Sequence, residues 1–261
     1  MPAADVYEVY AIRYARHERR ASENFLGGDP HDGPMPMDYF VWLARNRSRT
    51  IVVDTGFNAA TARKRKREFL RSPAAGLKLL GVDAKKVKDV ILTHLHYDHV
   101  GNFDLFPAAT FHLQDAEMYF ATGRHMASAP LAAVYDVKNV VGMVREVYQG
   151  RVRFYDGDAE FAPGVSLHLI GGHTMGLQVV RVQTRRGWVV LASDASHYYA
   201  NMNELRPFPI VYNVGDMIDG WRRVRELADS ADHIIPGHDP EVLRRYPAPN
   251  QKLAGVIARL D

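Results

Sequence analysis

The chain has 261 residues and no cysteine, which excludes disulfides and any metal site built from thiolates. This absence fits a reducing compartment. No apolar run approaches the roughly 20 residues that cross a bilayer, and short runs such as residues 189–192 are typical of buried strands. The N-terminal residues lack the apolar stretch behind a basic segment that marks a signal peptide. The sequence therefore predicts a cytoplasmic protein with no membrane partner.

A strong excess of one charge is also missing, since 33 lysines and arginines face 30 aspartates and glutamates. The net charge of +3 is too small to indicate nucleic-acid binding by itself. The densest basic run is Arg-Lys-Arg-Lys-Arg at residues 63–67, and such a run more often forms a solvated helix face. Nucleic acid is therefore not the expected partner.

Strand and helix patterns follow one another along the whole chain. Strands are predicted at residues 6–14, 39–44, 50–53, 87–92, 152–155, 165–170, 178–182, 188–192 and 233–235, and helices at 61–70, 114–122, 218–228 and 253–260. A Gly/Pro-rich loop is expected at 24–37 and a helical insertion at about 115–148. No linker interrupts this order, so we expect one domain over residues 1–261, with two sheets and helices outside them.

The strongest chemical signal is Thr-His-Leu-His-Tyr-Asp-His at residues 93–99, directly after an apolar strand. Neutral imidazole and carboxylate are the usual nitrogen and oxygen ligands of zinc and related ions. Alternation in an extended segment places His94 and His96 on one side. The turn that follows can carry Asp98 and His99 toward a second ion. One short segment can therefore contribute to two adjacent metal sites.

Two ions need more ligands than this segment offers, and further candidates lie downstream. Three of them share a position at the end of a predicted strand: His173, Asp194 and His238. A strand end is a rigid place to mount a ligand, and nearby glycine lets the backbone come close. A single histidine at a strand end is more often structural. The dense motif upstream is what makes these three residues candidate ligands.

The His-x-His-x-Asp-His motif at residues 94–99, followed by His173, Asp194 and His238, resembles the pattern of the metallo-β-lactamase superfamily. The resemblance covers about residues 50–240. It implies a mixed α/β (α+β) fold, namely the four-layer αββα sandwich of that superfamily. It also implies that the metal site lies at one edge of the two sheets.

Within the superfamily the chain looks most like the N-acyl homoserine lactonases. It is similar to them in length, in an N-terminal strand followed by a Gly/Pro loop, and in Ser-Asp-Ala at residues 193–195. Val-Asp-Thr-Gly at 53–56 and Gly-Gly-His-Thr at 171–174 are also similar to superfamily segments. The resemblance implies that Asp54 orients a ligand loop or a ligand imidazole without binding metal itself.

The resemblance implies two divalent ions and assigns their ligands. The first ion would be held by His94, His96 and His173, the second by Asp98, His99 and His238, and both by Asp194. Zinc is the default for such ligands, although Mn²⁺, Fe²⁺ and Co²⁺ tolerate the same set. Two ions about 3.5–4 Å apart can share a hydroxide that attacks the carbonyl carbon of a small-molecule lactone or related ester. The expected activity is therefore that of a dinuclear metal-dependent hydrolase, a lactonase of the quorum-quenching kind.

One position departs from the lactonases, which often place a tyrosine three residues after the bridging aspartate to hydrogen-bond the substrate carbonyl. Here that residue is His197, and Tyr198 and Tyr199 follow it. We expect His197 or Tyr198 to be the catalytic hydrogen-bond donor, with Tyr199 as a further candidate. Asp98 is expected to shuttle a proton in addition to binding metal.

Other hydrolases of the same superfamily stay open as alternatives. The basic run at 63–67 would suit a phosphodiesterase or nuclease, and a thioester hydrolase of the glyoxalase II kind is close to the lactonase hypothesis. Four apolar residues of the Gly/Pro loop either form a lid over the site or pack on the sheet edge: Phe25, Leu26, Met35 and Met37. Residues 118–148 form either a pocket wall or the surface of a homodimer.

Overall fold

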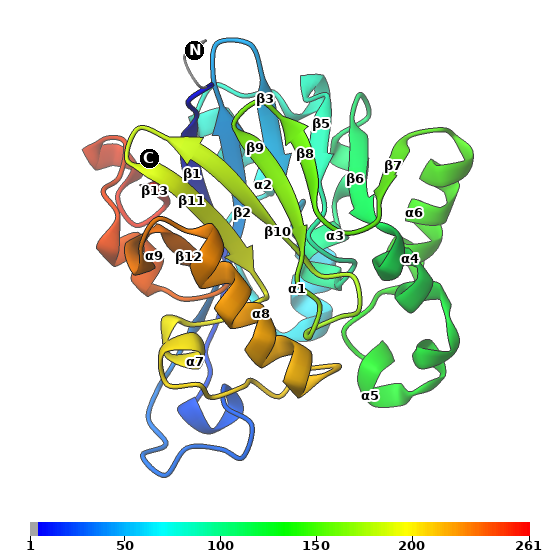
Figure 1. Ribbon diagram of the computed structural model, residues 1–261, viewed down its shortest axis with the longest axis vertical. Coiled ribbons are helices and arrows are strands. Elements are labelled where there is room, and N and C mark those ends of the chain that lie inside the picture. Colours follow the sequence, from blue (N-terminus) through cyan, green and yellow to red (C-terminus); the bar gives the residue numbers. More distant parts are fainter. Residues whose placement is uncertain (1–4) are drawn as a thin grey trace.

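Two stacked sheets form the centre of the computed structural model, which describes residues 5–261 (Figure 1). The strands span Glu8–His17 (β1), Met37–Arg45 (β2), Thr50–Val53 (β3), Glu68–Phe69 (β4), Asp89–Ile91 (β5), Thr110–Gln114 (β6), Val152–Tyr155 (β7), Ala159–Ala162 (β8), Val165–Leu169 (β9), Gln178–Thr184 (β10), Gly187–Ser193 (β11), Ile234–Pro236 (β12) and Ile257–Arg259 (β13). The larger sheet has the order β13-β1-β2-β3-β5-β6-β7, with β4 paired to β1, and the smaller sheet has the order β12-β11-β10-β9-β8.

Helices cover the outer face of each sheet. They span Ala59–Arg65 (α1), Pro73–Leu79 (α2), Tyr97–Val100 (α3), Asp115–Thr122 (α4), Ala129–Ala132 (α5), Val137–Tyr148 (α6), Tyr199–Asn203 (α7), Val214–Leu227 (α8) and Glu241–Arg245 (α9). Leu77 of α2, Phe120 of α4 and Met143 of α6 pack in the core cluster beside the larger sheet. Helix α8 lies across the outer face of the smaller sheet (Figure 1).

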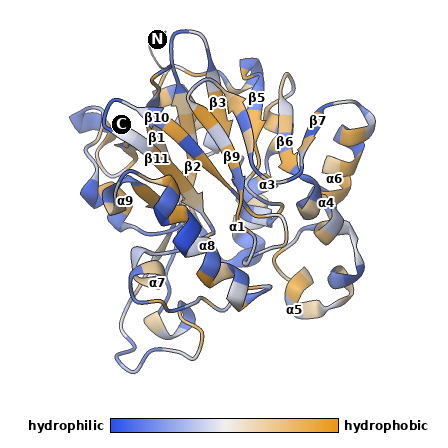
Figure 2. Cartoon of the chain, viewed as in Figure 1, coloured by the Kyte–Doolittle hydropathy of each residue, from blue (hydrophilic) through white to orange (hydrophobic). Residues whose placement is uncertain are grey.

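The central strand β2 shows why the sandwich has two cores. Side chains alternate across a strand, so Phe40 and Trp42 point between the sheets while Val41 and Leu43 point toward the helices. All four are buried, because both faces of this strand are covered. Figure 2 accordingly shows hydrophobic colouring along the central strands.

A third core forms where α8 meets the smaller sheet. Met217, Trp221 and Val224 recur on one face of the helix and pack against Val179 and Val190. The layers therefore run helix, sheet, sheet, helix, which confirms the predicted αββα sandwich. The region expected to be helical between β6 and β7 contains α4, α5 and α6.

Two predicted helices differ from the structure. The predicted closing helix at 253–260 is wrong, because β13 forms there and pairs with the edge of β1, Tyr10 facing Arg259. Gly255, at φ +69°, breaks any helix before it, and the β-branched residues that follow suit a strand. The helix predicted at 61–70 ends earlier, since Lys66 adopts φ 55° and the chain then forms β4.

Besides β4 and β13, the strands β6 and β8 were also not predicted, because their patterns are short and mixed. Both extend their sheets, β6 between β5 and β7 and β8 at the edge beside β9. Among the described residues, no helix combines the length and apolarity that crossing a membrane requires.

Candidate metal centre

The predicted ligands follow strand ends that meet at one edge of the sandwich. Strands β5, β9, β11 and β12 precede the segments that carry His94, His173, Asp194 and His238. Helix α3 begins directly after His96, so the chain turns from extended to helical within the motif and redirects Asp98 and His99. The edge is the one at which α1, α3 and α7 lie (Figure 1).

The first cluster consists of His94, His96, His173 and one carboxylate oxygen of Asp194, with ligand atoms within 4.8 Å of one another. Nε2 of His173 lies 3.0 Å from Nδ1 of His96 and 3.3 Å from Oδ2 of Asp194. Nε2 of His94 lies 3.9 Å from the same oxygen. Ligands bound tetrahedrally at 2.0–2.1 Å are about 3.3 Å apart, so this spacing fits one small divalent ion.

The second cluster consists of Asp98, His99 and His238. Nε2 of His99 and Nε2 of His238 lie 3.3 and 3.1 Å from Oδ1 of Asp194, and each lies 3.9 Å from Oδ2 of Asp98. The two oxygens of Asp194 therefore face different clusters. A single carboxylate between two sets of ligands is the arrangement of a dinuclear site.

Four of the imidazoles have Nδ1 beside a polar partner, which leaves Nε2 free to face the centre. The Nδ1 contacts are His94 with Thr93 Oγ1 at 3.1 Å, His99 with Asp54 Oδ2 at 2.7 Å, His173 with the Ile210 carbonyl at 2.6 Å and His238 with the Asp38 carbonyl at 2.9 Å. Such contacts fix the tautomer and orientation of a metal-binding imidazole. His96 differs, because its Nδ1 is the atom that faces the cluster.

Buried polar atoms without partners test whether cations fit. Within residues 5–261, Nε2 of His94, Nε2 of His99 and Oδ1 of Asp194 are buried and form no hydrogen bond. Each such atom costs roughly 1–3 kcal/mol, and divalent ions would satisfy all three. The side chain of Asp98 is 11% exposed, against 4% for Asp194. The residues therefore fit two ions, and Asp98 is the more exposed of these two carboxylates.

The ionisation of His94, His96 and Asp194 suits metal binding. Burial lowers the pKa of His94 and that of His96 well below the usual value, and neighbouring imidazoles lower both further. Both rings are neutral at pH 7 and keep a lone pair for a cation. Burial alone would raise the pKa of Asp194, but His238 and the other imidazoles hold it well below the usual value. Asp194 is therefore a charged carboxylate.

Residues 35–238 match the family model described as the metallo-beta-lactamase superfamily. The chain belongs to this superfamily. The matched range contains every residue of the two clusters, including Asp194.

Relatives within the superfamily include named lactonases. The N-acyl homoserine lactonase AiiB of Agrobacterium fabrum (strain C58) is 31% identical in an alignment 186 positions long that covers 63% of this chain. The match spans 61% of that relative's length. A crystal structure of a quorum-quenching N-acyl homoserine lactone lactonase has a TM-score of 0.78 at 22% identity, covering 94% of this chain and 97% of that one. AidC, a dizinc quorum-quenching lactonase solved with a product, has a TM-score of 0.70 at 17% identity, covering 91% and 89%.

Asp54 lies behind the second cluster of the superfamily site, as the resemblance implies. Its carboxylate accepts hydrogen bonds from the backbone N–H and the hydroxyl of Thr93, both at 2.8 Å, and lies 2.7 Å from Nδ1 of His99. Asp54 has φ 61°, an uncommon conformation that turns the chain sharply after β3. Gly237 is also required, because a Cβ there would lie 2.6 Å from Oδ1 of Asp194.

The three candidate donors after Asp194 lie in different places. Nε2 of His197 lies 3.0 Å from Oδ2 of Asp194, and its ring stacks on Phe208 at 3.6 Å. The hydroxyl of Tyr198 instead donates to the carbonyls of Met35 and Pro36. Tyr199 is buried in the core cluster that includes Val242 and Tyr246. Of the three, His197 is the residue that contacts Asp194, the carboxylate between the two clusters.

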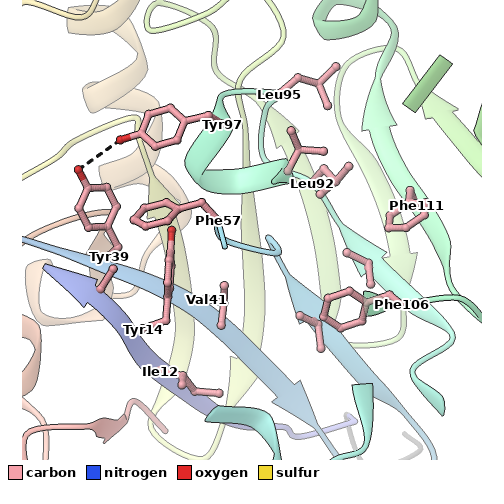
Figure 3. Close-up of a cluster of buried hydrophobic side chains, with 14 of the residues drawn as sticks. Ile12, Tyr14, Tyr39, Val41, Phe57, Leu92, Leu95, Tyr97, Phe106 and Phe111 are labelled. Atoms are coloured by element: carbon pink, nitrogen blue, oxygen red, sulfur yellow. Dashed lines mark hydrogen bonds between the residues drawn. The ribbon is translucent and has the colours of Figure 1, made fainter. Parts of the chain in front are cut away.

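An aromatic cluster supports the motif from below (Figure 3). Tyr97 stacks on Phe57, and its hydroxyl lies 3.4 Å from that of Tyr39. Tyr14 donates a hydrogen bond of 2.9 Å to the backbone carbonyl of Asp98. The ring of Tyr39 also meets the ring of His238 edge-on at 5.0 Å. These contacts hold the Asp98 turn and His238 in place.

Sequence reasoning missed most of the residues that orient the ligands. Thr93 could have been found, because it directly precedes the motif and carries a hydroxyl. The carbonyls of Asp38 and Ile210 have no signal in the sequence, since every residue has a carbonyl. Of the four apolar loop residues, Met35 and Met37 pack against the core cluster beside the larger sheet, so packing on the sheet accounts for these two. Phe25 is buried against the guanidinium of Arg206, and Leu26 is 52% exposed.

Proposed function

We propose that the chain is a dinuclear metal hydrolase that opens a lactone or cleaves a related ester. The observation that carries the proposal is the convergence of two ligand clusters on the two oxygens of one buried carboxylate, Asp194. Zinc suits this set of imidazoles and carboxylates. The similarity to named lactonases, one of them dizinc, supports both the substrate class and the metal.

The residues divide between two sites. His94, His96 and His173 would hold the first ion, Asp98, His99 and His238 the second, and Asp194 both. When bound, such a pair lowers the pKa of a shared water and polarises the carbonyl under attack. Because burial excludes bulk water from most ligands, the substrate would enter on the Asp98 side, where exposure is greatest.

His197 is the residue that we assign to the position beside the bridging carboxylate. Its Nε2 faces Oδ2 of Asp194, and stacking on Phe208 fixes the ring plane. Burial lowers the pKa of His197 to about 3, so the ring is neutral and Nε2–H donates to Asp194. We assign Tyr198 a supporting role, since its hydroxyl bonds the loop at Met35 and Pro36.

A second candidate, an anionic ester such as a phosphodiester, is favoured by two arginines near the motif. The guanidinium of Arg65 lies 3.7 Å from the ring centre of Tyr97, and Nε of Arg67 donates to the Tyr97 hydroxyl at 3.4 Å. Neither arginine forms an ion pair within the described part of the chain. Their unneutralised charge at Tyr97, next to Asp98, would suit a phosphate or carboxylate on the substrate.

The test combines metal analysis with a panel of substrates. The panel contains acyl-homoserine lactones, aliphatic lactones, an aryl ester, a glutathione thioester and bis(4-nitrophenyl) phosphate. We expect two metal equivalents per chain and the highest kcat/KM on a lactone. Preferred cleavage of the phosphodiester would replace the lactonase proposal by the second candidate, and preferred thioester cleavage would replace both.

A pair of variants tests the role of Asp194. Asp194→Ala should lose both metal equivalents and the activity together, because both sites share this residue. Asp158→Ala is the matched control, since Asp158 also contacts a histidine, His168 at 2.8 Å, outside the centre. Full activity of metal-replete Asp194→Ala would overturn the proposal.

A further inference from the structure

Glu117 places a fully buried carboxylate beside the first metal cluster without belonging to it. The residue lies in the first turn of α4 and has no exposed surface. A charged group at such a place costs several kcal/mol unless donors surround it. Burial accordingly raises the pKa of Glu117, and hydrogen bonds from Thr174, Leu95 and Tyr135 oppose that rise.

Four donors from three segments converge on this carboxylate. Oε1 accepts from the backbone N–H of Leu95 at 2.9 Å and from the hydroxyl of Tyr135 at 3.0 Å. Oε2 accepts from the hydroxyl of Thr174 at 2.6 Å and from the backbone N–H of Gly176 at 3.2 Å. Each oxygen therefore accepts from two donors.

Three of the four donors belong to the segments that carry the ligands of the first ion. Leu95 lies between His94 and His96, and Thr174 directly follows His173. The carboxylate of Glu117 thus connects the two segments whose imidazoles must converge. Tyr135 adds a second contact, because its ring meets the ring of His96 edge-on at 4.6 Å.

Close packing holds Glu117 against the segment that follows His173. A Cβ on Gly176 would lie 2.0 Å from the backbone nitrogen of Glu117, so the turn after His173 presses against the start of α4. A carboxylate is also the only common side chain that satisfies all four donors. In Glu117→Gln the NH₂ group would face one backbone N–H, of Leu95 or of Gly176, that has lost its acceptor.

We propose that Glu117 is a positioning residue for the first metal site, whose carboxylate sets the distance between His173 and the His94–His96 segment. It acts through these histidines and touches neither substrate nor metal. The inference rests on the proposed dinuclear site, but not on the identity of the substrate.

The experiment measures binding of Zn²⁺ to the metal-free full chain by competition with a chromophoric chelator, for the parent and for Glu117→Gln. We expect the affinity for one of the two equivalents to fall about 10- to 100-fold, as changes of partners behind metal ligands do. The other equivalent, held by Asp98, His99 and His238, should change less than threefold. The visible spectrum of the Co²⁺-loaded chain should change in the same selective way, because it reports ligand geometry.

Two further variants keep the test decisive. Thr174→Val removes one donor at almost constant volume and should give a smaller loss at the same equivalent, even if Glu117→Gln folds poorly. Glu146→Gln is the matched control, because Glu146 is also a buried carboxylate but pairs with Arg151 at 2.9 Å, away from the ligands. It should leave both equivalents unchanged.

The outcomes separate this inference from the proposed function. A parent chain that binds no metal would overturn both. A parent with two equivalents, together with Glu117→Gln and Thr174→Val that bind both as tightly, would overturn only the role of Glu117. Equal weakening of both equivalents would also overturn it, since a loss spread over the whole centre reflects a general effect on folding.

Discussion

Replacing Asp54 with asparagine should weaken the second metal ion while sparing the first. For Nε2 of His99 to bind metal, the proton of that ring must be on Nδ1, where Asp54 accepts it at 2.7 Å. The same carboxylate accepts two hydrogen bonds from Thr93. Asparagine offers only one acceptor oxygen. If that oxygen serves the N–H of Thr93, the NH₂ group faces Nδ1 of His99 and moves the ring proton to Nε2.

The size of the effect follows from the contacts that are lost. Substitution of such an indirect partner reduces metal affinity by about 10- to 100-fold, which corresponds to roughly 1.4–2.8 kcal/mol. One buried donor left without an acceptor costs roughly 1–3 kcal/mol, so both routes give the same range. The first ion should largely keep its affinity, because its imidazoles reach Asp54 only indirectly, through the Thr93 hydroxyl beside His94.

The assay is a stepwise titration of the metal-free chain with Zn²⁺, followed by metal analysis at a fixed free concentration. Asp158→Asn provides the control, since it alters a comparable contact with His168 outside the centre. Asp54→Asn should show one tight and one weakened equivalent. Two equivalents of parental affinity, or loss of the first ion before the second, would refute the tautomer argument.

Three other changes have defined outcomes. Removing the metal with a chelator should lower the midpoint of thermal unfolding, Tm, by about 5–10 °C. Metal at about 100 times its Kd stabilises the fold by roughly 2.7 kcal/mol, and each kcal/mol shifts Tm by about 2–4 °C at this chain length. An unchanged calorimetric midpoint would contradict ion binding. Burial, helped by Arg67, lowers the pKa of His17 to about 4, so the stability that the neutral ring contributes is complete above about pH 6.5 and is lost as the pH falls toward 4. In urea unfolding, His17→Gln should therefore lose less stability than the parent between about pH 6.5 and pH 4. An equal loss of stability in both proteins would contradict this role of His17. Trp221→Phe removes the 2.6 Å hydrogen bond to the Ala195 carbonyl and should cost about 1–3 kcal/mol in urea unfolding with two metal equivalents retained; a cost below about 0.5 kcal/mol would show that this bond contributes little.

The central strands and α8 could be predicted because their patterns are local. Alternation along β1, the nearly continuous apolar run of β2 and the 3.6-residue spacing in α8 each follow from which faces the fold covers. The end of the chain could not, because residues 257–259 are a strand only by pairing with β1. A short segment with few contacts of its own takes the structure that its partner imposes.

The ligands of the candidate centre were predictable for a related reason. A metal ligand must have one of a few side chains, so the motif at residues 94–99 is conspicuous in any sequence. His197 was singled out only because it lies three residues after Asp194 in the sequence. Glu117 and Tyr135 gave no signal, because each is separated from the ligands in sequence and acts by hydrogen bonds that only the folded chain reveals.

Whether an imidazole is oriented by a backbone carbonyl or by a side chain also predicts where the centre tolerates substitution. Nδ1 of His173 and Nδ1 of His238 bond backbone carbonyls, which survive substitution of Ile210 and Asp38 as long as the backbone stays in place. Nδ1 of His99 bonds a side chain, so its orientation is lost when Asp54 is replaced. The second ion therefore has one ligand with a side-chain partner and one with a backbone partner. Its sensitivity to mutation should be concentrated on the His99 side, where a single carboxylate fixes both the ring and the tautomer.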